Sequence, residues 1–123
     1  MDRPVAIDFA GMAPSRPADA AARSRAGVLE MGHPAVVAWQ VRMAVDEQAA
    51  AGPDYAATAQ ARVQGGEVLV GEGRALDLLD ALRLAFDDLE TQLESHQDRV
   101  RARAGQWLAT VRQRLSQRQR SFI

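Results

Sequence analysis

A long helical periodicity between Ala75 and about Leu115 constrains this 123-residue chain more than any other feature. Apolar residues recur there at spacings of three and four, which places them on one face of a helix; they are Leu79, Leu82, Phe86, Leu89 and Leu93. No proline or glycine interrupts the pattern before Gly105. A helix of this length, at about 1.5 Å per residue, exceeds the diameter of a small domain. We therefore expect its first half to be core and its second half to extend beyond the core.

The charges divide sharply at the end of the first half of this helix. Residues 1–98 contain 8 arginines and all 16 acidic residues, which leaves −8, whereas residues 99–123 contain 7 arginines and no acid, which gives +7. The chain has no lysine, so every basic side chain carries the planar guanidinium fork that suits phosphates and carboxylates. The sequence thus predicts an acidic domain over residues 1–98 and a basic amphipathic helical extension over residues 99–123, here called the C-terminal segment.

The C-terminal segment has an apolar face flanked by arginines on both sides. A basic amphipathic helix suits RNA phosphates, an acidic membrane surface or a partner helix, and a frayed tail is the remaining alternative. The candidate partner-interface residues are Val100, Trp107, Leu108, Val111 and Leu115. The candidate RNA-binding residues in this segment are Arg99, Arg101, Arg103, Arg112 and Arg114.

The chain before this helix alternates between strand and helix patterns. Val5, Ile7 and Phe9 alternate with smaller or polar residues, as in a half-buried strand. Ser15 can cap a helix that runs to about Met31, with an inner face of Ala18, Ala22, Ala26 and Leu29. A second strand follows, whose inward residues are expected to be Val37, Trp39, Val41, Met43 and Val45.

Two further strands precede the long helix. The third is expected over residues 55–63, with Tyr55, Ala57, Ala59, Ala61 and Val63 on one side. A tight turn at Gln64–Glu67 contains two glycines, which supply the positive φ of a hairpin turn. The fourth strand is expected to be short, Val68–Val70, with Gly71–Gly73 as the link to the helix.

The predicted order β-α-β-β-β-α defines an α+β fold with a four-stranded mixed sheet. The first two strands flank a helix, so they should be parallel with a right-handed crossover, and the last three should form an antiparallel meander. Both helices should then cover one face of the sheet. The other face should be wet; it carries Gln40, Arg42, Thr58, Gln60 and Arg62.

Signatures of catalysis are absent from the sequence. There is no cysteine, and the two histidines, His33 and His96, have no carboxylates at ligand spacing. The adjacent Asp87 and Asp88 diverge on a helix and are expected to be solvated. We therefore expect no catalytic residue, metal or cofactor. No signal peptide or membrane span is apparent, so a cytoplasmic location is expected.

Several local strings resemble the ribosome hibernation-promoting factor / ribosome-associated translation inhibitor family across about residues 4–98. The matching strings are Ile7–Ser15, Leu29–Glu30, Gly65–Val70, Ala85–Asp87 and Gln92–Glu94. The resemblance implies a protein that binds the small ribosomal subunit near the mRNA and tRNA channel and blocks translation in stressed or stationary cells. It also implies that basic residues on the two helices contact rRNA phosphates. Arg23 and Arg25 stand at basic positions of the family.

Two functions of different classes follow from these observations. The first is a non-enzymatic ribosome-associated translation inhibitor that binds small-subunit rRNA, and not DNA, through arginines. The second is a protein-interaction module of the same fold that has lost ribosome binding and self-associates through its C-terminal helix. In a homodimer, we expect the basic segment of one chain to contact the acidic domain of its mate, with RNA binding as a competing use of the same arginines.

Overall fold

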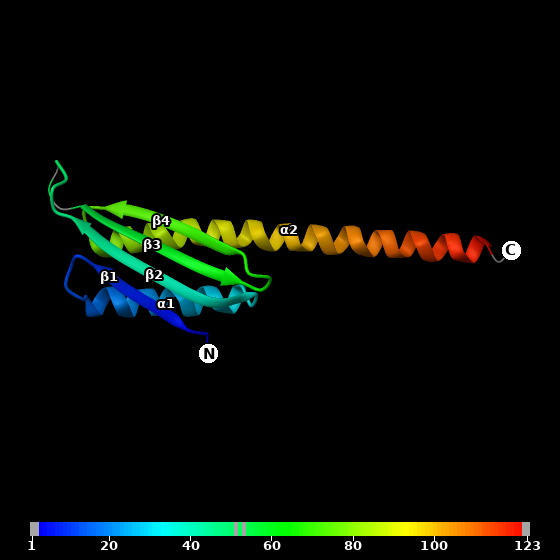
Figure 1. Cartoon of the computed structure of the whole chain (residues 1–123), viewed down its shortest axis with the longest axis horizontal. Coiled ribbons are helices and arrows are strands. Elements are labelled where there is room, and N and C mark those ends of the chain that lie inside the picture. The colour runs from blue at the N-terminus through cyan, green and yellow to red at the C-terminus, as the bar shows by residue number, and fades with distance from the viewer. Residues whose placement is uncertain (1–2, 51, 53, 122–123) are drawn as a thin grey trace. The chain divides into compact units, whose positions relative to one another are not determined.

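The computed structural model describes residues 3–50, 52 and 54–121, and its elements follow the predicted order. They are β1 (Val5–Ala10), α1 (Arg16–Gly32), β2 (Val36–Asp46), β3 (Asp54–Val63), β4 (Val68–Ala75) and α2 (Leu78–Ser121), as Figure 1 shows. The chain divides into two compact units, Met1–Leu93 and Glu94–Ile123. Helix α2 contributes residues to both units, which are described separately below.

The sheet of the first unit has the predicted mixed topology, with the strands in the order β1-β2-β3-β4. β1 pairs in parallel with β2, and the other two pairings are antiparallel. Helix α1 and the first part of α2 cover the same face of this sheet and run in the same direction (Figure 1). The predicted α+β class is therefore confirmed.

The core lies between this face and the two helices, and α1 contributes the predicted inner face of Ala18, Ala22, Ala26 and Leu29. Three alanines allow α1 to lie close to the sheet, whose β3 strand also presents alanines inward: Ala57, Ala59 and Ala61. The larger buried side chains fill the remaining space, with Trp39, Phe86 and Met43 the largest. The indole Nε1–H of Trp39 donates to Glu30 Oε1 at 3.1 Å, so its one polar atom is satisfied inside the core.

The inward residues of β2 match the prediction only after the start of the strand. Trp39, Val41 and Met43 are buried as expected and Val45 is half-buried, but Val36 is buried in place of Val37, which is half-buried. The register shifts between Val36 and Ala38, so Val37 is an extra residue on the bulged strand. A single inserted residue reverses the alternation before it, which explains why the prediction for Val37 was wrong.

β4 is longer than predicted, because the glycines assigned to a linker belong to the strand. A Cβ on Gly71 would lie 2.2 Å from the carbonyl oxygen of Ala85, and one on Gly73 would lie 2.3 Å from that of Ala81. Because neither glycine has a Cβ, the backbone of α2 can pack close to β4. The strand continues to Ala75, and α2 begins at Leu78 rather than Ala75.

The close approach of α2 also changes which of its residues face the sheet. Ala81 and Ala85 are fully buried opposite the glycines, together with Leu82, whereas Leu79 is 45% exposed. The predicted apolar stripe was therefore correct from Leu82 to Leu93 and wrong for Leu79. The helix is rotated so that its alanines, rather than Leu79, contact the strand.

The outer edge of β4 is covered by side chains of α2. The backbone N–H of Glu72 donates to Asp88 Oδ2 at 3.0 Å, and Gln92 Nε2 donates to the carbonyl oxygen of Val70. Asp88 is exposed, as expected, and it also has this backbone partner. Occupied edge groups disfavour the addition of a further strand.

Phe86→Ala should destabilise the first unit strongly. The Phe86 ring is completely buried in the same core as Val41, Met43 and Leu89, and removing a buried phenylalanine side chain costs about 3–5 kcal/mol. Urea unfolding followed by circular dichroism measures the change, with the equally apolar but exposed Leu84→Ala as the control. A cost below about 1 kcal/mol would show that Phe86 does not pack as described.

Candidate nucleic-acid and partner interface

Arg25 connects the two helices of the first unit through a charged cluster. Its Nη2 donates to Asp87 Oδ1 and to Glu90 Oε2, each at 2.8 Å. Arg83 joins the cluster, 3.6 Å from Asp87. Because two carboxylates contact the one guanidinium, the positive charge of Arg25 is already offset within the protein.

Arg23, the second predicted RNA-binding residue of α1, lies on another flank of the helix. Its Nε donates to Asp19 Oδ1 at 2.7 Å, and its Nη1 is 3.5 Å from the carbonyl oxygen of Val5 in β1. Arg23 thus reaches toward β1, whereas Arg25 reaches toward α2. The structure does not bring the two arginines to one point, and both are ion-paired.

The arginines of the C-terminal segment have a different environment. Arg99, Arg101, Arg103, Arg112 and Arg114 are all exposed. Within the part of the chain that the structure describes, the last four of these have no carboxylate partner. An exposed guanidinium without an internal partner can bind an external phosphate or carboxylate without first breaking an ion pair.

The predicted apolar face of the second unit is also largely exposed. Trp107 is 65% exposed, Leu115 54%, and Val100 and Leu108 48% each, while Val111 is half-buried. An exposed contiguous set that includes a tryptophan typically marks an interaction surface. Among the described residues, this helix therefore carries an apolar face together with the exposed guanidinium groups of Arg101, Arg103, Arg112 and Arg114.

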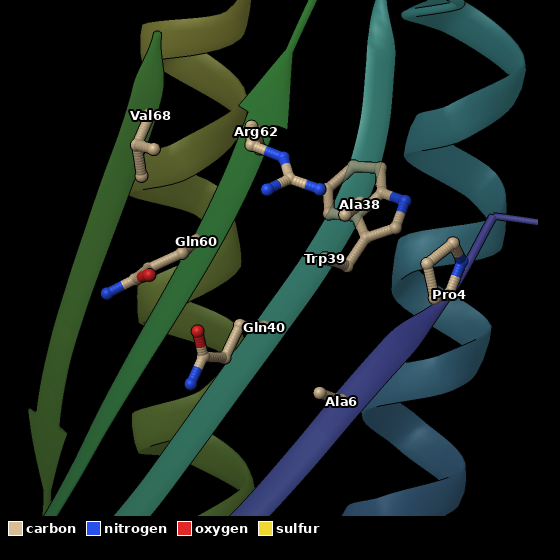
Figure 2. A pocket seen from close by; sticks show the side chains of 8 residues that line it. All are labelled: Pro4, Ala6, Ala38, Trp39, Gln40, Gln60, Arg62 and Val68. Carbon is tan, nitrogen blue, oxygen red and sulfur yellow. The ribbon is translucent and has the colours of Figure 1, made fainter. Parts of the chain in front are cut away.

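The outer face of the sheet is polar, as predicted, although Thr58 and Gln60 are half-buried. Gln40, Arg42 and Arg62 are exposed, and Arg42 lies 3.9 Å from Asp8. A depression of about 310 Å³ lies at this face. Figure 2 shows the side chains that line it, which are Pro4, Ala6, Ala38, Trp39, Gln40, Gln60, Arg62 and Val68. Small side chains form much of its lining, and the polar groups are two amides and one guanidinium.

The described ranges contain no cluster of metal ligands and no helix suited to a membrane. Across residues 3–50, 52 and 54–121 there is no group of three or more potential metal ligands among histidine, cysteine, aspartate and glutamate. In the same residues, no helix combines the length and apolar character of a membrane span. His33 and His96 come from separate parts of the sequence and form no such group.

The β-α-β-β-β-α sheet with two helices on one face defines a small α+β domain, here with exposed arginines in an adjoining helical segment. Residues 5–101 match the family described as sigma 54 modulation protein / S30EA ribosomal protein, and the chain therefore belongs to this family. This confirms the family resemblance that the local strings indicated. No curated protein matches the chain in a sequence comparison.

Solved structures share the fold at low sequence identity. A ribosomal subunit interface protein from Coxiella burnetii superimposes with a TM-score of 0.67 at 12% identity, covering 77% of this chain and 98% of that one. The N-terminal domain of Thermus thermophilus Protein Y gives a TM-score of 0.58 at 18% identity, covering 78% of this chain and 99% of that one. At these identities the similarity establishes the fold.

Sequence reasoning missed the acidic partners of the helix arginines. Asp87 is exposed, as expected, but it also contacts both Arg25 and Arg83. The Asp19–Arg23 pair has a local signal, since residues four apart face each other on a helix. The Arg25 contacts span 62 and 65 residues and have no signal in a single sequence.

Proposed function

We propose that this chain is a non-enzymatic, ribosome-associated inhibitor of translation that binds small-subunit rRNA through the arginines of its C-terminal segment. Membership of the S30EA ribosomal protein family supports the ribosome as partner. The choice of residues rests on a contrast within the described part of the chain. Arg23 and Arg25 are ion-paired there, whereas Arg101, Arg103, Arg112 and Arg114 are exposed and have no carboxylate partner among the described residues. Such a factor acts in the cytoplasm, where ribosomes are.

The charge distribution explains why the C-terminal segment should provide most of the attraction. Residues 1–98 carry −8 and are repelled by RNA, whereas residues 99–123 carry +7. Arginine forks bind phosphates bidentately, and each neutralised phosphate releases condensed counterions. The affinity should therefore depend steeply on salt.

Arg99 is a further candidate because it is exposed in the same segment, and Arg23 and Arg25 are secondary candidates. Both α1 arginines are held by carboxylates, which an rRNA phosphate would have to replace. The exchange costs little at Arg23, because its side chain is 54% exposed and its ion pair is screened by water. At Arg25 it would leave Asp87 and Glu90 close together without their shared cation, which disfavours that contact.

A second function is favoured by the exposed apolar face of the second unit. In this alternative, the chain is a protein-interaction module of the same fold that self-associates through Val100, Trp107, Leu108, Val111 and Leu115. The ion-paired state of Arg23 and Arg25 supports it as well, since the helix layer then offers little free positive charge. The two functions differ in one property, the presence of ribosome affinity.

Co-sedimentation of the full chain with purified small ribosomal subunits tests the proposal. We expect the protein to pellet with the subunits at about 50 mM salt and to be released by about 200 mM, as for a binder that relies on phosphate contacts. Inhibition in a reconstituted translation reaction should follow the same salt dependence. Failure to pellet at low salt, with the protein folded, would favour the interaction module instead.

A further inference from the structure

Helix α1 exposes two large apolar side chains next to the charged cluster. Met31 is 86% exposed and Val28 is 61% exposed. Val28 follows Arg25 by one helical turn and Met31 follows Val28 by another, so Val28 is the surface neighbour of both on α1. Arg25 contacts Asp87 and Glu90, which places Arg25 beside α2 and Val28 next to that charged contact.

The surface around Val28 and Met31 combines apolar contact with excess negative charge. The adjoining cluster contains the carboxylates of Asp80, Asp87 and Glu90 against the guanidinium groups of Arg25 and Arg83. We call Val28, Met31, Asp87 and Glu90 together the α1 surface. Its apolar side chains match the apolar face of the C-terminal helix, and its carboxylates match the arginines that flank that face.

We propose that the α1 surface binds the C-terminal helix of a second copy of this chain, and that this contact withholds the helix from RNA. Trp107 and Leu108 of one chain would cover Val28 and Met31 of the other, and the flanking arginines would face the acidic domain. The inference rests on the proposed function, because the arginines it covers are those proposed to contact rRNA. It adds a partner and a form of regulation to that site.

Charge complementarity selects this arrangement over direct pairing of two C-terminal helices. The described part of the segment carries arginines on both flanks of its apolar face and no acid at all, so two such helices would bring like charges together. Docking on a domain of charge −8 instead joins opposite charges. A twofold dimer uses the contact twice, which brings the buried area toward the roughly 1,600 Å² of a standard interface.

Dimerisation and RNA binding must then oppose each other. The same arginines cannot contact the acidic domain of a partner and a phosphate backbone simultaneously. By linkage, RNA should weaken the dimer by the same factor as the dimer weakens RNA binding. A short RNA hairpin added to the full chain should therefore shift dimers to monomers at low salt.

Charged substitutions on α1 test the docking surface in the full-length protein. Val28→Asp combined with Met31→Glu should weaken the dimer by about 100-fold, the effect of losing a central apolar contact. Both positions are exposed, so the fold should persist. Val68→Asp is the matched control, since Val68 is 49% exposed on β4 and should leave the dimer unchanged. Sedimentation equilibrium measures both, and a dimer unaffected by the α1 changes would overturn the inference.

Crosslinking tests the geometry directly, because the chain contains no cysteine of its own. One preparation carries Met31→Cys and another Leu108→Cys, so a short bismaleimide can join them only between different chains. We expect the mixed crosslink, and none when Val68→Cys replaces Met31→Cys. Crosslinks confined to Leu108→Cys pairs, or a full chain that stays monomeric, would overturn the inference, while co-sedimentation with small subunits reports separately on the proposed function.

Discussion

Gly71→Ala should destabilise the first unit by more than about 4 kcal/mol, beyond the usual range for a single substitution. The added Cβ would lie 2.2 Å from Ala85 O, 2.5 Å from Leu89 N and 2.8 Å from Leu89 Cβ. Two of these atoms belong to the helix backbone, so no rotation of a flexible side chain can relieve the overlap. Helix α2 would have to move away from β4, which opens the core around Phe86.

The same substitution at Gly105 provides the control. Gly105 lies within α2, and a Cβ there would meet nothing within 4 Å. Alanine is favoured over glycine in a helix by about 1 kcal/mol, so Gly105→Ala should leave the first unit unchanged and strengthen the local helix. Urea unfolding of both variants by circular dichroism separates the two effects. If Gly71→Ala unfolds within about 1 kcal/mol of the parent chain, the close contact between β4 and α2 is not as described.

The elements that sequence reasoning predicted well are those with a complete local signal. The spacing of Ala18, Ala22, Ala26 and Leu29 identified the inner face of α1, and Ser15 does cap that helix by accepting from the N–H of Ala18. The hairpin at Gln64–Glu67 also follows from local chemistry, since Gly65 and Gly66 both adopt positive φ. In each case the residues that determine the structure are neighbours in the chain.

The errors occurred where a distant element decides the local structure. Gly71 and Gly73 have the composition of a linker, but their lack of a side chain serves the packing of Ala81 and Ala85. A single sequence does not distinguish a glycine that provides a positive φ in a turn from a glycine that lets a helix pack closely on a strand. The extra residue at Val37 likewise has no signal in the sequence, because a bulge depends on the register of the partner strand.

The candidate site likewise has one part that local sequence predicts and one part that distant residues determine. The basic, apolar character of the C-terminal segment is a local property, and residues 99–116 of that segment are exposed except for the half-buried Val111. The state of Arg25 depends on Asp87 and Glu90, more than 60 residues away, and could not be inferred from helical spacing. The sequence indicates which arginines exist, whereas the fold decides which of them are already paired.

Replacing the five arginines Arg99, Arg101, Arg103, Arg112 and Arg114 by glutamine should nearly abolish binding to small ribosomal subunits. Glutamine has a helix propensity close to that of arginine, so the helix should persist. If each arginine neutralises one phosphate, the slope of log affinity against log salt should become shallower by roughly 4 to 5. Co-sedimentation of the variant and the parent chain over the same salt series measures both changes.

Two smaller variants separate local contacts from total charge. Arg101→Gln with Arg112→Gln removes two charges from the C-terminal segment, and Arg42→Gln with Arg62→Gln removes two from the outer face of the sheet. Only the first pair should reduce the salt slope, by roughly 2, because direct phosphate contacts act one by one. An equal loss of salt slope from both pairs would mean that overall charge governs binding.

Arg23→Gln with Arg25→Gln should have a small effect on binding to small subunits, since these arginines already contact Asp19, Asp87 and Glu90. A loss of binding as large as that of the five-arginine variant would instead mean that the rRNA contacts the helices of the domain.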